Sequence, residues 1–217
     1  MKSASLYWVI MLVLCAGFYG SLKVWQHFAA AESQTADDSA VIASAHAAPT
    51  IGDLDQSVKH FELIDQDGQS FDSDELKGKV WVASFFFTNC PGTCWRLNQA
   101  VANLQTETDE SVRLISITCD PKNDTPEALA KYAKHFKAEP KRWTFLTGDF
   151  DAIEKVGRDS FLVAVKVGVH SERAMVVDRQ GKVRGAYNML DQEQIAKLKN
   201  KVDELLAEST ATAEPKS

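Results

Sequence analysis

The sequence predicts a domain of the α/β class, in which a central sheet is covered by helices. Strand-like and helix-like residue patterns alternate along the middle of the chain, which is typical of this class. Residues 80–87 form an almost continuous apolar run, as expected of a central strand that is buried on both faces. A hairpin pattern and an amphipathic helical pattern follow toward the C-terminus. Because a doubly buried strand needs helices on both sides, these observations favour a layered sheet.

Turn and capping signals place the individual elements. Residues 60–65 alternate and are expected to pair with residues 70–71 across an Asp67-Gly68 turn, which predicts an N-terminal hairpin. Pro126 suits the first turn of a helix, and Asp191 suits a helix cap. The other expected elements are helix 91–106, strand 112–117, helix 125–136, strand 143–146, helix 149–156, strands 173–177 and 182–187, and a closing helix that ends near residue 206.

Composition divides the chain of 217 residues into four parts. We expect one folded domain over residues 52–206, which is an ordinary domain size. Residues 29–51 and 207–217 contain few large apolar side chains, so they are predicted to be a flexible linker and a disordered tail. Residues 1–28 are predicted to be a membrane anchor or a signal segment.

The N-terminal part has no charged residue from Leu6 to Leu22, between Lys2 and Lys23. This run is near the lower limit for a helix that crosses a bilayer core of about 30 Å. A single N-terminal transmembrane helix is the favoured interpretation, and a cleaved signal peptide with small residues at 29–31 is the alternative. Either interpretation places the domain on the extracytoplasmic side, in the bacterial periplasm or an equivalent compartment. The domain is membrane-anchored in the first case and secreted in the second.

The charge balance argues against a nucleic-acid partner. The chain has 24 basic and 30 acidic residues, which give a net charge of −6, and the basic residues are scattered. Four cysteines are too few for a disulfide scaffold in a chain of this length. Their positions are more informative, because Cys15 lies in the apolar run, Cys90 and Cys94 are close together, and Cys119 stands alone.

Cys90 and Cys94 are the strongest candidates for a functional site. They follow the predicted central strand and open the next helix, whose N-terminus stabilises a thiolate. Their spacing places both sulfurs on one helix face, at the sheet edge where such folds bind ligands. Disulfide oxidoreductases of the thioredoxin type usually have two intervening residues, whereas this chain has Pro-Gly-Thr. Two thiolates also suit a soft metal ion, and Cu(I) with a third ligand from elsewhere is the candidate.

Other potentially reactive side chains have weaker patterns. Cys119 ends the strand that follows the central one, so it is interpreted as a small buried residue or, alternatively, as a redox partner of the thiol pair or an extra thiolate for the site. Asp120 and Asp124 are interpreted as loop and cap residues rather than as ligands. Four histidines have no partner pattern and are interpreted as structural or solvated: His27, His46, His60 and His135.

Three segments resemble the SCO/SenC family. Residues 82–94, which end in Cys90-Pro-Gly-Thr-Cys94, are similar to the copper motif of that family. Residues 116–126 resemble its strand and the Asp-Pro and Asp-Thr loop that follows. Val169-His-Ser171 resembles the segment that supplies its histidine ligand. The resemblance spans about residues 52–206, and the three motifs together are specific.

The resemblance implies a thioredoxin-like fold, a membrane anchor and bound copper. It implies Cys90 and Cys94 as the thiolate ligands and His170 as the imidazole ligand, with Cu(I) favoured and Cu(II) as the alternative. The family serves assembly of the copper centre of cytochrome c oxidase, by metal delivery, by reduction of the acceptor's cysteines, or by both. The implied partner is therefore a copper-acceptor protein, a cytochrome c oxidase subunit. Trp95 departs from the family, which commonly has proline at that position, and Val169 stands where the family often has aspartate.

Two functions follow from these residues. The leading hypothesis is a copper metallochaperone that binds through Cys90, Cys94 and His170. The alternative is an exported thiol–disulfide oxidoreductase, in which Cys90 and Cys94 are catalytic and His170 is dispensable. A peroxidase of the peroxiredoxin type is less favoured, because Phe86 rather than threonine precedes Cys90 by four residues. An enzymatic activity is thus expected only if the protein is a thiol–disulfide oxidoreductase or a peroxidase.

Overall fold

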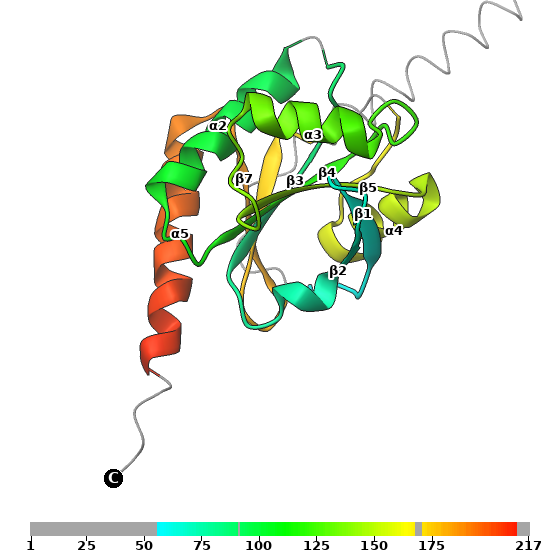
Figure 1. Ribbon diagram of the computed structural model, residues 1–217. Coiled ribbons are helices and arrows are strands. Elements are labelled where there is room, and N and C mark those ends of the chain that lie inside the picture. The colour runs from blue at the N-terminus through cyan, green and yellow to red at the C-terminus, as the bar shows by residue number, and fades with distance from the viewer. Residues whose placement is uncertain (1–55, 91, 168–170, 212–217) are drawn as a thin grey trace, which may run out of the picture. The chain divides into compact units, whose positions relative to one another are not determined.

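A seven-stranded sheet forms the centre of the computed structural model (Figure 1). The structure describes residues 56–90, 92–167 and 171–211. The strands are β1 (Glu62–Asp65), β2 (Ser70–Asp72), β3 (Trp81–Phe86), β4 (Arg113–Thr118), β5 (Trp143–Thr147), β6 (Arg173–Val177) and β7 (Val183–Asn188). The helices are the short 3₁₀ helix η1 (Ser73–Leu76), α2 (Thr93–Glu107), α3 (Pro126–His135), α4 (Phe150–Phe161) and α5 (Gln192–Ala211).

The sheet is mixed, with the order β2-β1-β5-β4-β3-β6-β7. Its middle strands β3, β4 and β5 are parallel, and the helical crossovers α2 and α3 connect them. The outer strands are antiparallel, and the N-terminal hairpin β1-β2 extends the sheet at β5. This arrangement confirms the α/β class and the hairpin extension that the sequence predicts.

Side chains on the two faces of the sheet form two separate apolar cores. One contains Val82 and Phe86 of β3, packed with residues of α2, α3 and α5. The other contains Trp81 and Phe85, packed with residues of α4, η1 and the β1-β2 hairpin. Figure 1 shows α2 and α3 together on one side of the sheet. Both faces of β3 are buried, which explains why the sequence of this strand is almost continuously apolar.

Two helices continue beyond their expected ends. The sequence predicts a helix end near residue 156, but α4 runs on to Phe161 and ends at Leu162, which has a φ of 54°. Gly157 is required for packing, since a Cβ atom at this position would lie 2.4 Å from the Cγ2 atom of Val165. Helix α5 runs past residue 206 to Ala211, beyond the start expected for the C-terminal tail.

The predicted anchor, residues 1–28, and the whole of the predicted linker, residues 29–51, are not among the residues that the structure describes. In the ranges that are described, no helix combines the length and the apolar character needed to cross a membrane. A membrane anchor therefore stays a prediction from the sequence.

Candidate thiol metal site

The thiol pair lies where β3 ends and α2 begins, as the sequence predicts. Cys90 is in the connection and Cys94 is the second residue of α2. Gly92 is the N-cap of α2 and has φ 148° and ψ −51°, a conformation that favours glycine because it has no Cβ. Its backbone N–H donates to the carbonyl oxygen of Cys90 at 2.9 Å. This tight turn places the start of α2 next to Cys90.

The two cysteines lie in direct contact and are not joined by a disulfide. The backbone N–H of Cys94 donates to the Cys90 Sγ at 3.3 Å. Cys90 is partly exposed, whereas Cys94 is 1% exposed. Cys90 therefore lies on the solvent side of the pair, and Cys94 lies on its inner side.

Burial changes the acidity of the inner thiol. Removal from water raises the pKa of Cys94 well above its usual range, and the neighbouring Cys90 raises it further. A backbone hydrogen bond from Phe87 lowers this pKa, but the effect of burial is larger. Cys94 is thus a neutral thiol at pH 7, so a thiolate-binding metal ion must displace its proton.

The connection that carries Cys90 is held by Asp124, a residue that is 0% exposed. The Asp124 Oδ2 accepts the backbone N–H of Thr88 at 3.1 Å. The hydroxyl groups of Thr88 and Thr118 also donate to the Asp124 carboxylate. Asp124 thereby ties the end of β4 to the segment before Cys90. This role agrees with the interpretation of Asp124 as a loop residue.

Cys119 reaches the same edge of the sheet but belongs to a different core. Its backbone N–H donates to the carbonyl oxygen of Phe86 at 2.7 Å, so it lies directly beside the end of β3. Its side chain is 0% exposed and packs in the second core, whereas Cys94 packs in the first. Burial, reinforced by Asp124 and Asp120, raises the pKa of Cys119 to about 12. These observations support the interpretation of Cys119 as a small buried residue.

The sequence analysis did not identify two residues that lie beneath the thiol pair, Asn98 and Tyr132. The Asn98 Nδ2 donates to the carbonyl oxygen of Cys94 at 3.0 Å and to the Tyr132 hydroxyl oxygen at 3.3 Å. Asn98 is 0% exposed and comes one helical turn after Cys94. A polar residue four positions after a candidate ligand, on the buried face of its helix, is the pattern that could have indicated it.

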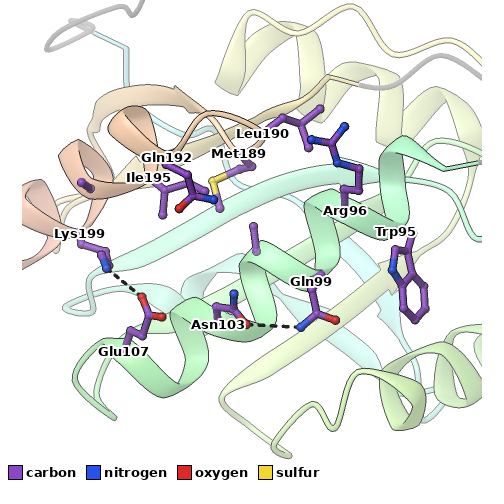
Figure 2. A pocket seen from close by; sticks show the side chains of 12 residues that line it. Trp95, Arg96, Gln99, Asn103, Glu107, Met189, Leu190, Gln192, Ile195 and Lys199 are labelled. Carbon is purple, nitrogen blue, oxygen red and sulfur yellow. Dashed lines mark hydrogen bonds and ion pairs between the residues drawn. The ribbon is translucent and has the colours of Figure 1, made fainter.

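Trp95 is prominent beside the site, with 47% of its surface exposed. Its ring lies 4.7 Å from the ring of His135 and 4.9 Å from that of Phe136, measured between centroids. A groove of about 440 Å³ starts at Trp95 and runs between α2 and α5 (Figure 2). An ion pair between Lys199 and Glu107, with 2.8 Å between Nζ and Oε2, spans its far end.

The predicted third ligand, His170, lies outside the described residues. The described chain resumes at Ser171, and β6 then pairs antiparallel with β3, with Ala174 opposite Ser84. Strand β6 therefore begins at the edge of the sheet where β3 ends. Ligation by His170 stays a prediction.

A second group of potential ligands occurs on the β1-β2 hairpin. Single ligand atoms of His60, Glu62 and Asp72 lie within 4.8 Å of one another. The group is solvent-accessible, and the His60 Nε2 and Asp72 Oδ1 already form a contact of 3.0 Å. Asp72 also accepts the backbone N–H of Asp74 as the cap of η1. These contacts agree with the interpretation of His60 as a structural or solvated histidine.

A thioredoxin-like sheet with two adjacent thiols at a strand-to-helix junction defines a class of protein. Such domains use the thiols for redox exchange or for binding a soft metal ion. Within this class, the chain belongs to the SCO1/SenC family, whose model matches residues 50–207.

Individual relatives agree with this assignment. The SCO1 protein homolog of Bacillus subtilis is 34% identical over 145 residues, which cover 62% of this chain and 75% of the relative. A protein of Stutzerimonas stutzeri that is named for copper binding is 31% identical over 108 residues, which cover 48% of this chain and 52% of the relative. The solved structure of BsSco, a Sco-family cytochrome c oxidase assembly protein with a disulfide switch, has a TM-score of 0.63 and 31% identity. That match covers 71% of this chain and 96% of the BsSco chain.

Proposed function

We propose that this protein is a copper metallochaperone that binds one copper ion through Cys90, Cys94 and His170. It delivers the ion to an acceptor protein, a cytochrome c oxidase subunit. The observation that carries the proposal is the contact between the Cys94 backbone N–H and the Cys90 Sγ, which brings a partly exposed and a buried cysteine together at the N-terminus of α2. Membership of the SCO1/SenC family and the relative that is named for copper binding support the choice of metal.

The chemistry of the donor set fits copper. Thiolates are soft ligands that select Cu(I), and an imidazole completes a site for Cu(I) or Cu(II). Zinc in a structural site usually takes four protein ligands. Cys90 offers the accessible sulfur at which the cargo enters and leaves, and Cys94 offers the inner one. Loading releases the Cys94 proton, because this thiol is neutral before the metal binds.

The place of action follows from the N-terminal sequence. Residues 1–28 would hold the domain at the membrane on the extracytoplasmic side, where it can meet the acceptor. Residues 29–51 would form the linker. Protease protection of the full chain in sealed vesicles of known orientation tests this topology.

An anaerobic Cu(I) titration of the reduced full chain tests the ligand set. The wild type should bind about one equivalent, as measured by competition with a chromophoric chelator. Cys90→Ser and Cys94→Ser should lose this binding, and His170→Ala should weaken it. His135→Ala serves as the matched control, because His135 contacts the ring of Trp95 and is not a predicted ligand. Equal affinities of the wild type and the two cysteine variants would exclude the proposed site.

A second candidate function is thiol–disulfide exchange, which the contact of 3.3 Å between the Cys94 N–H and the Cys90 Sγ also favours. In this reaction the two thiols lose two protons and two electrons and form a disulfide. A disulfide in the acceptor takes up the electrons and protons and becomes two thiols. Exchange should require both cysteines and tolerate His170→Ala, whereas copper binding should not. Both assays on the same preparation therefore separate the two functions.

A further inference from the structure

The groove between α2 and α5 is not used in the metal site proposed above. It starts at Trp95, the residue that follows Cys94, and its wall on α2 runs from Arg96 to Glu107 (Figure 2). At about 1.5 Å per residue this wall is about 16 Å long, which is the length of about five residues of extended chain. The groove is therefore next to the thiol pair and long enough for a short peptide segment.

The α2 wall of the groove is polar. Its side chains come from exposed positions three or four residues apart on one face of the helix, and they are Arg96, Gln99, Asn103 and Glu107. The Gln99 Nε2 donates to the Asn103 Oδ1 at 3.4 Å, so the two amides form a row along the groove. Side-chain amides carry both donors and acceptors, as the peptide backbone does, and they can therefore hydrogen-bond to a bound main chain.

The floor of the groove is apolar. Met189 is buried, and Ala100 and Ile195 are half-buried. An apolar centre with a polar rim is the usual composition of a protein-binding surface. Tryptophan and arginine, which stand at the entrance as Trp95 and Arg96, are enriched among the residues that contribute most to binding.

Arg96 gives the groove a positive charge that is not neutralised within it. At the far end, Lys199 and Glu107 neutralise each other through their ion pair. Within the part of the chain that the structure describes, the exposed Arg96 side chain has no carboxylate partner, and Figure 2 shows it extending toward Leu190. The whole chain has a net charge of −6, so this positive charge is a local exception. Charge complementarity therefore favours a ligand that carries a carboxylate at this end of the groove.

We propose that the groove is the docking surface for the copper-acceptor protein, which places an extended acidic segment in it. A carboxylate of this segment pairs with Arg96 in the bidentate geometry that guanidinium groups favour, and an apolar side chain packs on Met189 and Ile195. This inference rests on the proposed function, since the occupant is the protein that receives the copper. Docking at Trp95 brings the acceptor next to Cys90, the partly exposed cysteine of the pair.

The affinity of the complex provides the first test. The probe is the metal-free cytochrome c oxidase subunit that receives the copper, titrated in detergent into the reduced full chain. Arg96→Glu should raise the Kd at least about tenfold, because it removes a charge-assisted hydrogen bond and adds repulsion. Lys155→Glu is the matched control, since it makes the same change of charge on the exposed surface of α4, which packs on the other face of the sheet. Its Kd should stay within about twofold of the wild type, because distant surface charges are screened by salt.

Photo-cross-linking provides the second test, because it locates the occupant. Gln99→p-benzoylphenylalanine in the full chain places a photoreactive group on the α2 wall of the groove. Illumination of its mixture with the same subunit should link the group to a segment that contains Asp or Glu, as identified by mass spectrometry. The same group at Lys155 should give no link. Thermal melts of all variants confirm that each is folded, as expected for changes at exposed positions.

Equal affinity of the wild type and Arg96→Glu for the subunit would overturn the inference, and so would the absence of any complex. A loss of equal size in Lys155→Glu would also overturn it, because the effect would then come from net charge alone. A cross-link to a second copy of the chain would show that the groove is a dimer interface instead. If the wild type binds no copper but Arg96→Glu still weakens docking of the subunit, the proposed function fails and the inference stands. If copper binds as proposed and Arg96→Glu docks like the wild type, only the inference fails.

Discussion

Cys94 and Cys119 are both buried cysteines at the same edge of the sheet, yet their surroundings differ. Each has a raised pKa, and burial is the main cause in both cases. Cys94 has a second thiol in contact with its backbone N–H and the Asn98 amide one helical turn away. Cys119 has apolar neighbours on the opposite face and two nearby carboxylates that oppose ionisation. The comparison teaches that a partner thiol and access, rather than burial, distinguish a site from a core residue.

The largest effect expected is loss of the partner thiol. Cys90→Ser or Cys94→Ser should weaken Cu(I) binding by at least about two orders of magnitude, because loss of a ligand exceeds the effect of outer-shell changes. Cys119→Val should leave the affinity within about threefold of the wild type, since its side chain packs in the other core. Competition titrations measure all three variants. A large loss in Cys119→Val alone would reverse the assignment of the two cysteines.

The next effect concerns Asp124. This residue links the segment after β3, which leads to Cys90, with the end of β4, which leads to Cys119. Asp124→Asn preserves the shape but weakens three hydrogen bonds to a buried carboxylate. We expect the free energy of unfolding to fall by about 3 kcal/mol, as estimated for charge-assisted bonds in a buried site. Chemical denaturation of the metal-free chain measures this. Asp151→Asn, which alters an exposed carboxylate in the first turn of α4, is the control and should change stability little.

An effect that is smaller per pH unit should appear in the pH dependence of stability. The pKa of Cys119 is about 12 in the folded chain, compared with an ordinary value of 9.0. The unfolded chain therefore ionises first as the pH rises. The stabilising contribution is complete below pH 9.0 and is lost between pH 9.0 and about 12. Within this range the buried thiol should make the free energy of unfolding fall by about 1.4 kcal/mol per pH unit.

A comparison of variants shows which cysteine causes the fall of the free energy of unfolding with pH. Cys94 has a pKa shift in the same direction and should contribute similarly, so Cys119→Val should reduce the slope without removing it. Denaturation of the reduced, metal-free chain below and above pH 9.0 provides the measurement. If Cys119→Val has the same slope as the wild type, Cys119 does not have the raised pKa on which the comparison depends.

The smallest effect is expected at Trp95, beside the thiol pair. Because the ring is almost half exposed, Trp95→Ala should reduce the free energy of unfolding by about 1 kcal/mol or less. Its Cu(I) affinity should stay within about threefold of the wild type, since Trp95 offers no ligand atom. Thermal melts and competition titrations check both values. A large loss of affinity would show that Trp95 shapes the thiol site.

The sequence predicts the sheet well because its signals are local. The apolar run at 80–87 becomes β3, the Asp67-Gly68 turn joins β1 to β2, and Asp191 accepts backbone N–H groups at the start of α5. The end of α4 could not be predicted, because Gly157 is a common stop signal whose role here depends on contact with Val165. Local patterns do not contain such contacts between a helix and the loop that follows it.

The same distinction applies to the site. Cys90 and Cys94 are close in sequence, so their pairing at a strand-to-helix junction follows from their spacing. The separation of Cys119 from them depends on which face of β4 its side chain joins. The hydrogen bond between Asn98 and Tyr132 depends on the packing of α2 against α3, which no local motif specifies. The third ligand, His170, rests on resemblance to the SCO/SenC family rather than on described contacts.

X-ray absorption spectroscopy of the copper-loaded full chain tests the central claim most directly, because it identifies the atoms bound to the metal. The account predicts two sulfur ligands and one imidazole nitrogen in the wild type. It predicts loss of the imidazole nitrogen in His170→Ala, which should still bind copper, and an unchanged spectrum in Cys119→Val. A wild-type spectrum with no sulfur ligand would contradict the account. So would a third sulfur that disappears in Cys119→Val.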